Sequence, residues 1–145
     1  MAGRPYRARM RVEGSCHCGF FTFKADADLE TAGVCHCTDC QAISGSAFRT
    51  TVRAAPGTFA ITSGSPTLYV KTTAESGNKR EHAFCPRCGT SVYAASVGAE
   101  PRTYSLRFGT LKQKDAIAPK RQIWTRSRVK WLGELSGVQG FDRGA

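Results

Sequence analysis

Short segments in which apolar and polar residues alternate follow one another along most of the chain, and this two-residue period predicts β-strands. The segments are rich in Val, Thr, Phe and Tyr. They cover residues 8–14, 20–26, 47–54, 58–64, 67–73, 79–85, 90–96 and 102–108. Gly-Ser-Pro at 64–66 and Ser-Gly-Asn at 76–78 indicate turns between neighbouring strands. The pattern therefore predicts a mainly β fold built from antiparallel sheets.

One segment departs from this alternation and fits a helix. Residues 38–44, Thr-Asp-Cys-Gln-Ala-Ile-Ser, are long enough for about two helical turns, and Thr38 is a suitable N-cap. The segment overlaps a group of cysteines at 35–40. We therefore expect one short helix beside that cysteine group.

Length and composition bound the class of protein. The chain has 145 residues, of which 41% are hydrophobic and 22% charged, as in a globular domain. We predict one domain over residues 1–145, with residues 1–10 as a flexible basic end. No apolar run is long enough to span a bilayer, and the first residues lack the apolar middle of a secretory signal. We expect no membrane association and a location in the reducing cytoplasm.

Charge adds a hint about partners. The net charge is +10, and basic residues concentrate near both ends, at 4–11 and 112–130. Such a surplus favours anions, such as nucleic acid, a phosphorylated metabolite or a small molecule with a carboxylate. The same charges also suit a solvated surface without any partner, so composition alone leaves both interpretations open.

Seven cysteines carry the strongest signal. They form three groups, Cys-His-Cys at 16–18, Cys-His-Cys-Thr-Asp-Cys at 35–40 and Cys-Pro-Arg-Cys at 85–88. An odd count without a secretory signal argues against a disulfide framework. The pair at 85–88 precedes a predicted strand, whereas a thioredoxin-like redox pair leads into a helix. Metal binding is the interpretation that remains, and zinc is the metal that thiolates favour.

The spacing suggests how the thiols divide. Two short pairs far apart in sequence suit a closed tetrahedral site, so we assign a structural zinc to Cys16, Cys18, Cys85 and Cys88. This site would cross-link a loop of about seventy residues, where a small domain gains most stability. Cys35, Cys37 and Cys40 remain as three ligands on one segment.

Three ligands with an open fourth position are typical of a catalytic zinc. The alternative is a second structural site that a histidine closes. His17, His36 and His82 are the only histidines, and we expect His36 to point away from the ion because it lies between two ligands.

The ordered motifs resemble a known family. Gly-Ser-Cys-His-Cys-Gly at 14–19, the segment 35–50, Phe-Cys-Pro-Arg-Cys-Gly-Thr-Ser-Val-Tyr at 84–93 and Gly-Thr-Leu-Lys-Gln at 109–113 are similar to the glutathione-dependent formaldehyde-activating enzymes. That family also includes the centromere protein V group. Residues 123–132 resemble the end of its members as well.

The resemblance implies a fold, two metals and an activity. It implies packed antiparallel sheets of the Mss4-like type, with the structural zinc and the second zinc on the cysteines assigned above. The implied activity is that of a carbon–sulfur lyase working in the synthetic direction, which joins glutathione and formaldehyde into S-hydroxymethylglutathione. Zinc, two ions per chain, would be the cofactor, and a small thiol such as glutathione and an aldehyde would be the partners.

Two questions stay open at this level. A non-catalytic zinc module that binds nucleic acid or protein is the alternative function, which the basic ends favour, and the oligomeric state is unknown. Residues 44–50 follow the cysteines and could line a pocket in which Arg49 meets a carboxylate; a solvated Arg49 is the alternative. We expect Trp124 and Trp131 to be packing residues.

Overall fold

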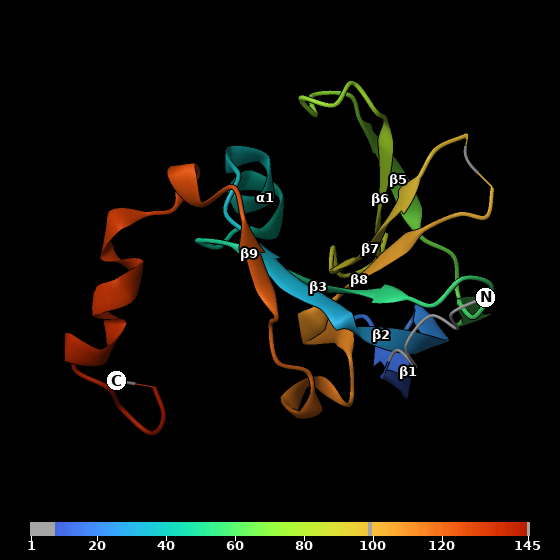
Figure 1. Cartoon of the computed structure of the whole chain (residues 1–145). Helices are drawn as coiled ribbons and strands as arrows, with labels where there is room; N and C mark the ends of the chain where they lie inside the picture. The colour runs from blue at the N-terminus through green and yellow to red at the C-terminus, as the bar shows by residue number, and fades with distance from the viewer. Residues whose placement is uncertain (1–7, 99, 145) are drawn as a thin grey trace.

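The structure, a computed structural model, describes residues 8–98 and 100–144. Within them the chain forms strands, one short α-helix and several 3₁₀ turns (Figure 1). The strands are β1 (Arg9–Ser15), β2 (Thr22–Cys35), β3 (Arg49–Ala54), β4 (Ala60–Ser63), β5 (Thr67–Lys71), β6 (Arg80–Phe84), β7 (Ser91–Ser96), β8 (Tyr104–Arg107) and β9 (Arg121–Ile123). The helix α1 is Thr38–Ser44, and the 3₁₀ segments are η1 (Phe108–Thr110), η2 (Lys114–Ala116), η3 (Thr125–Ser127) and η4 (Lys130–Gly137).

The strands form one hydrogen-bonded sheet in the order β1-β2-β3-β8-β7-β6-β5. All of these neighbours are antiparallel, while β4 and β9 pair with β2 outside this path, β9 in parallel. In Figure 1 the β5–β6–β7 part rises away from the β1–β2–β3 part, and α1 lies between β9 and β5 as drawn. The predicted mainly β, antiparallel fold is confirmed.

The core fills the space enclosed by the bent sheet. Phe21, Phe23, Val52 and Leu106 are fully buried, and Tyr104 stacks on Phe59 with ring centroids 4.2 Å apart. Burying such side chains is the main favourable contribution to folding, at about 2 kcal/mol for each large one.

Some predicted elements differ from the observed ones. The helix prediction at 38–44 is confirmed, but Cys37 is the N-cap and its Sγ accepts a hydrogen bond from the Cys40 amide at 3.3 Å. The strand predicted to end at residue 26 continues to Cys35, with an irregularity between Asp28 and Gly33. Polar residues in this stretch hid the strand. The basic end predicted at 1–10 lies mostly outside the described residues.

The C-terminal segment also departs from expectation. Trp124 is 36% and Trp131 52% exposed, so the prediction that both are packing residues is wrong for Trp131 and only partly met by Trp124. Figure 1 shows this segment, coloured red, standing beside the sheet. Within the described residues, none of the helices is long and apolar enough to cross a membrane.

Candidate metal centres

The first group of thiols joins two distant turns. Cys16 and Cys18 lie in the turn between β1 and β2, and Cys85 and Cys88 lie between β6 and β7. Their four sulfurs lie within 4.8 Å of one another. We call this group the four-cysteine cluster.

Both turns of the four-cysteine cluster end in a glycine with positive φ, Gly19 at 81° and Gly89 at 76°, a conformation that a side chain would strain. This lets each turn fold its two sulfurs to the same side. The Phe21 amide donates to Cys16 Sγ at 3.2 Å, and the Arg87 amide donates to Cys85 Sγ at 3.4 Å. Backbone N–H donors of this kind stabilise thiolates.

The sulfur spacing fits zinc. Cys16 Sγ lies 3.7 Å from Cys18 Sγ, which lies 3.8 Å from Cys85 Sγ. Four sulfurs bound tetrahedrally at about 2.3 Å from one ion lie ~3.8 Å from each other. None of the seven cysteines forms a disulfide. The donor set and the spacing therefore match a closed zinc–thiolate site.

The second group comes from a single segment. Cys35 ends β2, Cys37 caps α1 and Cys40 lies in its first turn, and their sulfurs also lie within 4.8 Å of one another. We call this group the three-cysteine cluster. In the part of the chain that the structure describes, no histidine, carboxylate or further cysteine brings a fourth ligand atom into it.

None of the three histidines that could have closed this cluster contributes a ligand atom to it. The His36 ring is buried, pairs through Nε2 with Gln122 Oε1 at 2.9 Å, and does not join the sulfurs, as expected from its place between two cysteines. Its Nδ1 is buried without a hydrogen-bond partner. His82 faces two arginines, and His17 is exposed. The alternative of a histidine-closed site therefore has no support in this geometry.

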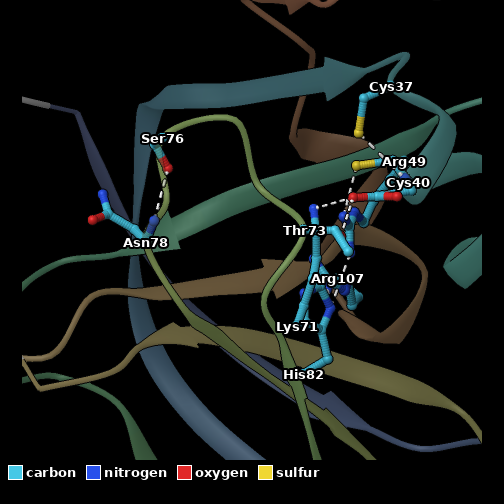
Figure 2. Close-up of polar contacts among 10 residues, drawn as sticks. Cys37, Cys40, Arg49, Lys71, Thr73, Ser76, Asn78, His82 and Arg107 are labelled. Atoms are coloured by element: carbon cyan, nitrogen blue, oxygen red, sulfur yellow. Dashed lines mark hydrogen bonds and ion pairs between the residues drawn. The ribbon is translucent and has the colours of Figure 1, made fainter.

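Arg49 on β3 adjoins the three-cysteine cluster. Its Nη2 donates to Cys40 Sγ at 2.6 Å, and its Nη1 lies 3.4 Å from His82 Nδ1, which also accepts from Arg107 Nη2 at 3.0 Å (Figure 2). The pKa of Cys40 is lowered to about 5, chiefly by its hydrogen bond with Cys35 and further by Arg49. Burial, with the charges of Arg107 and Arg49, lowers the pKa of His82 to about 3, so its ring is neutral.

A pocket opens beside the three-cysteine cluster, and we call it the Cys37 pocket. It has a volume of 450 Å³. Its walls are Cys37, Thr38, Asp39, Lys71, Thr73, Ala74, Glu75, Ser76, Trp124, Arg126 and Ser127. One of the three cysteines, the partly exposed Cys37, therefore borders the pocket.

Polar contacts hold the walls of the Cys37 pocket together. Asp39 pairs with Lys71 at 2.9 Å and accepts a hydrogen bond from Thr73 at 2.8 Å, which attaches the loop after β5 to α1 (Figure 2). Arg126 pairs with Glu75 at 2.8 Å and lies over the Trp124 ring. Trp124 has a φ of 58°, a strained value for a side chain of its size.

Five of the residues 44–50 line a second pocket of 640 Å³, which agrees with the pocket interpretation of this stretch rather than with a wholly solvated loop. Arg49 is one of its walls, although the Arg49 partner that the structure reveals is Cys40 rather than a carboxylate. The pocket lies between the two cysteine clusters, because it also contains His17 and Thr90 from the neighbourhood of Cys18 and Cys88. We call it the inter-cluster pocket.

Comparison with known proteins decides the family. A family profile described as glutathione-dependent formaldehyde-activating enzyme matches residues 11–127, a stretch that holds all seven cysteines. The chain belongs to the glutathione-dependent formaldehyde-activating enzyme family. No curated protein gives a significant match.

One solved structure supports the fold of this family member. The crystal structure of a Rhodobacter sphaeroides protein superposes with a TM-score of 0.55 at 20% sequence identity, covering 74% of this chain and 96% of that one. At this identity the likeness concerns the fold.

Sequence reasoning missed several residues around the cysteines of this formaldehyde-activating family member. Asp39, Lys71 and Arg126 reach the Cys37 pocket from three separate elements, and Arg107 reaches His82 from β8. Nothing in their local sequence marks them. The pairing of β3 with β8 brings Arg107 beside β3, and the pairing of β5 with β6 places Lys71 on the strand next to His82.

Proposed function

We propose that this protein is a zinc-dependent enzyme of the carbon–sulfur lyase type, which joins a small thiol and an aldehyde into an S-hydroxymethyl adduct. Glutathione and formaldehyde are the proposed substrates, in agreement with the family. The observation that carries the proposal is the three-cysteine cluster, which gathers three thiols with no fourth ligand from any described residue and borders the Cys37 pocket.

The proposal assigns a metal role to each cluster. The four-cysteine cluster would hold a structural zinc on Cys16, Cys18, Cys85 and Cys88, and the three-cysteine cluster would hold a second zinc on Cys35, Cys37 and Cys40. When bound by three thiolates, zinc supplies a Lewis-acid centre that favours a thiol in its deprotonated, nucleophilic form. A cytoplasmic location remains our prediction, and seven free thiols suit such a reducing compartment.

The surrounding residues would prepare this site. Arg49 places a positive charge on Cys40 and so favours its thiolate form. The Asp39–Lys71 pair fixes the loop that forms one wall of the Cys37 pocket, and Trp124 forms another. A substrate held between these walls is oriented, and orientation together with a high effective concentration contributes most to joining two small molecules.

The proposed reaction balances without a further reactant. The sulfur of the thiol attacks the carbonyl carbon of the aldehyde, so that a C–S bond forms while the carbonyl π bond breaks. The electron pair moves to oxygen, which takes up the proton that the thiol releases. The product is the hydroxymethyl thioether, and nothing is oxidised or reduced.

The test must separate catalysis from the spontaneous reaction. Exchange between ¹³C-formaldehyde and its glutathione adduct is measured by NMR with the zinc-loaded protein, with Cys37→Ser, and without protein. We expect the wild type to accelerate exchange and Cys37→Ser to match the protein-free rate. Equal exchange in all three samples would refute the proposed function.

The basic C-terminal segment supports a second candidate function, a zinc module that binds nucleic acid. Arg121, Arg126, Arg128 and Lys130 are exposed or partly exposed near the exposed Trp131. Titration with duplex DNA at two salt concentrations tests this candidate. Tight binding that weakens steeply with salt would favour the module over the enzyme.

A further inference from the structure

The inter-cluster pocket has walls of one chemical kind. They carry hydroxyls, two guanidinium groups, one imidazole and two aromatic rings, and none of the described residues in them is acidic. The lining residues are Ser15, His17, Ser44, Ser46, Phe48, Arg49, Thr50, Thr90, Ser91, Arg107, Phe108, Gly109 and Thr110. A pocket of hydrogen-bond donors with a positive charge and no carboxylate suits an anion.

Arg107 is the most deeply buried charged group in the walls of this pocket. Its side chain is only 7% exposed, and among the described residues it has no acidic partner within ion-pair distance. A guanidinium buried to this degree is normally paired, because an isolated buried charge is costly. Among the described residues Arg107 therefore has no carboxylate partner, and the nearest negative group that acts on it is the Cys40 sulfur.

The hydrogen bonds of Arg107 use two of its five N–H donors and leave Nη1 unpaired among the described residues. Its Nε donates to Ser91 Oγ at 3.2 Å, and its Nη2 donates to the neutral His82 ring at 3.0 Å. Within the described residues, Nη1 makes no hydrogen bond, although Arg107 lines the pocket. A planar guanidinium with a free edge is suited to bind the two oxygens of a carboxylate.

A second positive charge lies close to Arg107, and the repulsion between the two would be relieved by a bound anion. Arg49 directs its own charge at the same His82 nitrogen, so two guanidinium groups converge on one uncharged acceptor. Burial, followed by the charge of Arg49, lowers the pKa of Arg107 to about 9. The Cys40 sulfur accepts its hydrogen bond from Arg49 (Figure 2), and it acts on Arg107 only through its charge, which opposes this lowering of the pKa.

We propose that the inter-cluster pocket is a carboxylate-binding subsite, in which the free edge of Arg107 and the side chain of Arg49 hold a carboxylate of the substrate thiol. This inference rests on the proposed function for the identity of the ligand. Arg49 provides the link, because it lines the pocket and contacts Cys40. The subsite would make the enzyme selective for thiols with a carboxylate over uncharged thiols.

The first experiment varies the ligand and leaves the protein intact. Calorimetry with the zinc-loaded protein compares glutathione, its diethyl ester and S-methylglutathione. The ester has no carboxylate, whereas S-methylglutathione keeps both but has a capped sulfur. We expect the ester to bind about tenfold more weakly than glutathione or worse, as the loss of a charge-assisted hydrogen bond predicts. Equal affinities of glutathione and ester would overturn the proposal.

The second experiment locates the site. Arg107→Lys keeps the charge but loses the planar edge, and Arg53→Lys on the exposed side of β3 is the matched control. We expect S-methylglutathione to bind Arg107→Lys about tenfold more weakly, with Arg53→Lys unchanged. In the wild type, S-methylglutathione should also shift the NMR signal of the Arg107 Nε–H group. An unshifted signal, or a higher affinity for inorganic phosphate than for S-methylglutathione, would overturn the carboxylate assignment.

Failure of the subsite can be distinguished from failure of the proposed function. Cobalt in the three-cysteine cluster gives an absorption band that a thiol ligand perturbs. If glutathione binds in the inter-cluster pocket but leaves the cobalt band unchanged, the proposed function fails and the carboxylate site stands. If 2-mercaptoethanol and glutathione perturb the band at equal concentrations, thiol binding stands and the subsite is refuted.

Discussion

The four-cysteine cluster and the three-cysteine cluster use the same side chain in opposite ways. The first draws its sulfurs from two turns that are 67 residues apart between Cys18 and Cys85. The second takes all of its sulfurs from the six residues 35–40. A metal in the first would connect the β1–β2 turn to the β6–β7 turn, whereas a metal in the second would cross-link almost nothing.

This difference suggests that a metal in the first cluster would stabilise the fold, whereas a metal in the second would be available for chemistry. A cross-link between distant turns restricts the unfolded chain strongly, so the free energy of metal binding becomes free energy of folding. A cluster within one short segment would contribute little in this way, and under the proposed function its incomplete ligand set would leave room for a substrate. The comparison therefore predicts which site the fold depends on.

The largest expected effect comes from changing one cysteine in each cluster. Cys85→Ser should unfold or aggregate the protein, because a structural zinc contributes about 10 kcal/mol or more, as much as the whole stability of a typical domain. Cys37→Ser should lose one ion and keep the fold. Metal analysis and circular dichroism check both. Equal damage from the two changes would mean that both clusters are structural.

Metal removal should follow the same order. With increasing chelator, we expect one zinc ion per chain to leave while the circular dichroism spectrum stays unchanged, because the three-cysteine cluster is incomplete and solvent reaches Cys37. The second ion should leave only as the fold is lost. Simultaneous loss of both ions would contradict the division into two kinds of site.

A smaller effect is expected from removing a side chain that is hydrogen-bonded to a sulfur of one cluster. Arg49→Gln removes the N–H group that donates to Cys40, and Thr90→Val removes the hydroxyl 3.2 Å from Cys88 Sγ. Each change should weaken metal binding ~10-fold or more at its own cluster and leave the other unaffected. Competition with a coloured chelator measures both affinities. A change that weakens both clusters alike would show that they are coupled.

The smallest effect concerns His82, which adjoins the three-cysteine cluster through Arg49. Burial lowers its pKa to about 3 in the folded protein, while an unfolded histidine titrates near pH 6.5. Between these values the unfolded chain binds a proton that the folded protein does not, so stability falls as the pH drops below about 6.5.

Urea unfolding of the wild type and of His82→Asn at pH 7.5 and pH 5.5 measures this contribution. We expect the wild type to lose on the order of 1 kcal/mol more than the variant between the two conditions. Metal release at acidic pH affects both proteins, so the difference between them isolates the histidine. Identical losses would mean that His82 becomes protonated in the folded state.

The sequence predicted what local spacing determines. The prediction of a helix at 38–44 is confirmed. Gly45 adopts the positive φ that ends the helix, and no residue within the segment opposes helix formation. The seven cysteines gather in the structure as two groups. A tight turn suffices for each short pair or trio, whereas the meeting of the two distant pairs depends on the sheet. Their zinc occupancy and their roles remain predictions, as does the single domain over the whole chain.

Features that depend on contacts between residues distant in sequence could not be predicted from local spacing. The second half of β2 contains Asp28 and Glu30, which hide the apolar pattern, and its existence depends on pairing with β3 and β9. The group of Arg49, His82 and Arg107 exists because three strands place these side chains together. Trp131 looked like a packing residue, but it is 52% exposed. Pairing between strands, which a single sequence does not display, decides the first two.

The separation between Cys18 and Cys85 also has a consequence for biosynthesis. A nascent chain that has emerged as far as Cys40 already carries every sulfur of the three-cysteine cluster, although β3 and the remaining strands are still missing. The four-cysteine cluster must wait until Cys88 has left the ribosome. The thiols proposed for catalysis are thus the first that the cell can load with metal, before the sheet that will shelter them has been made.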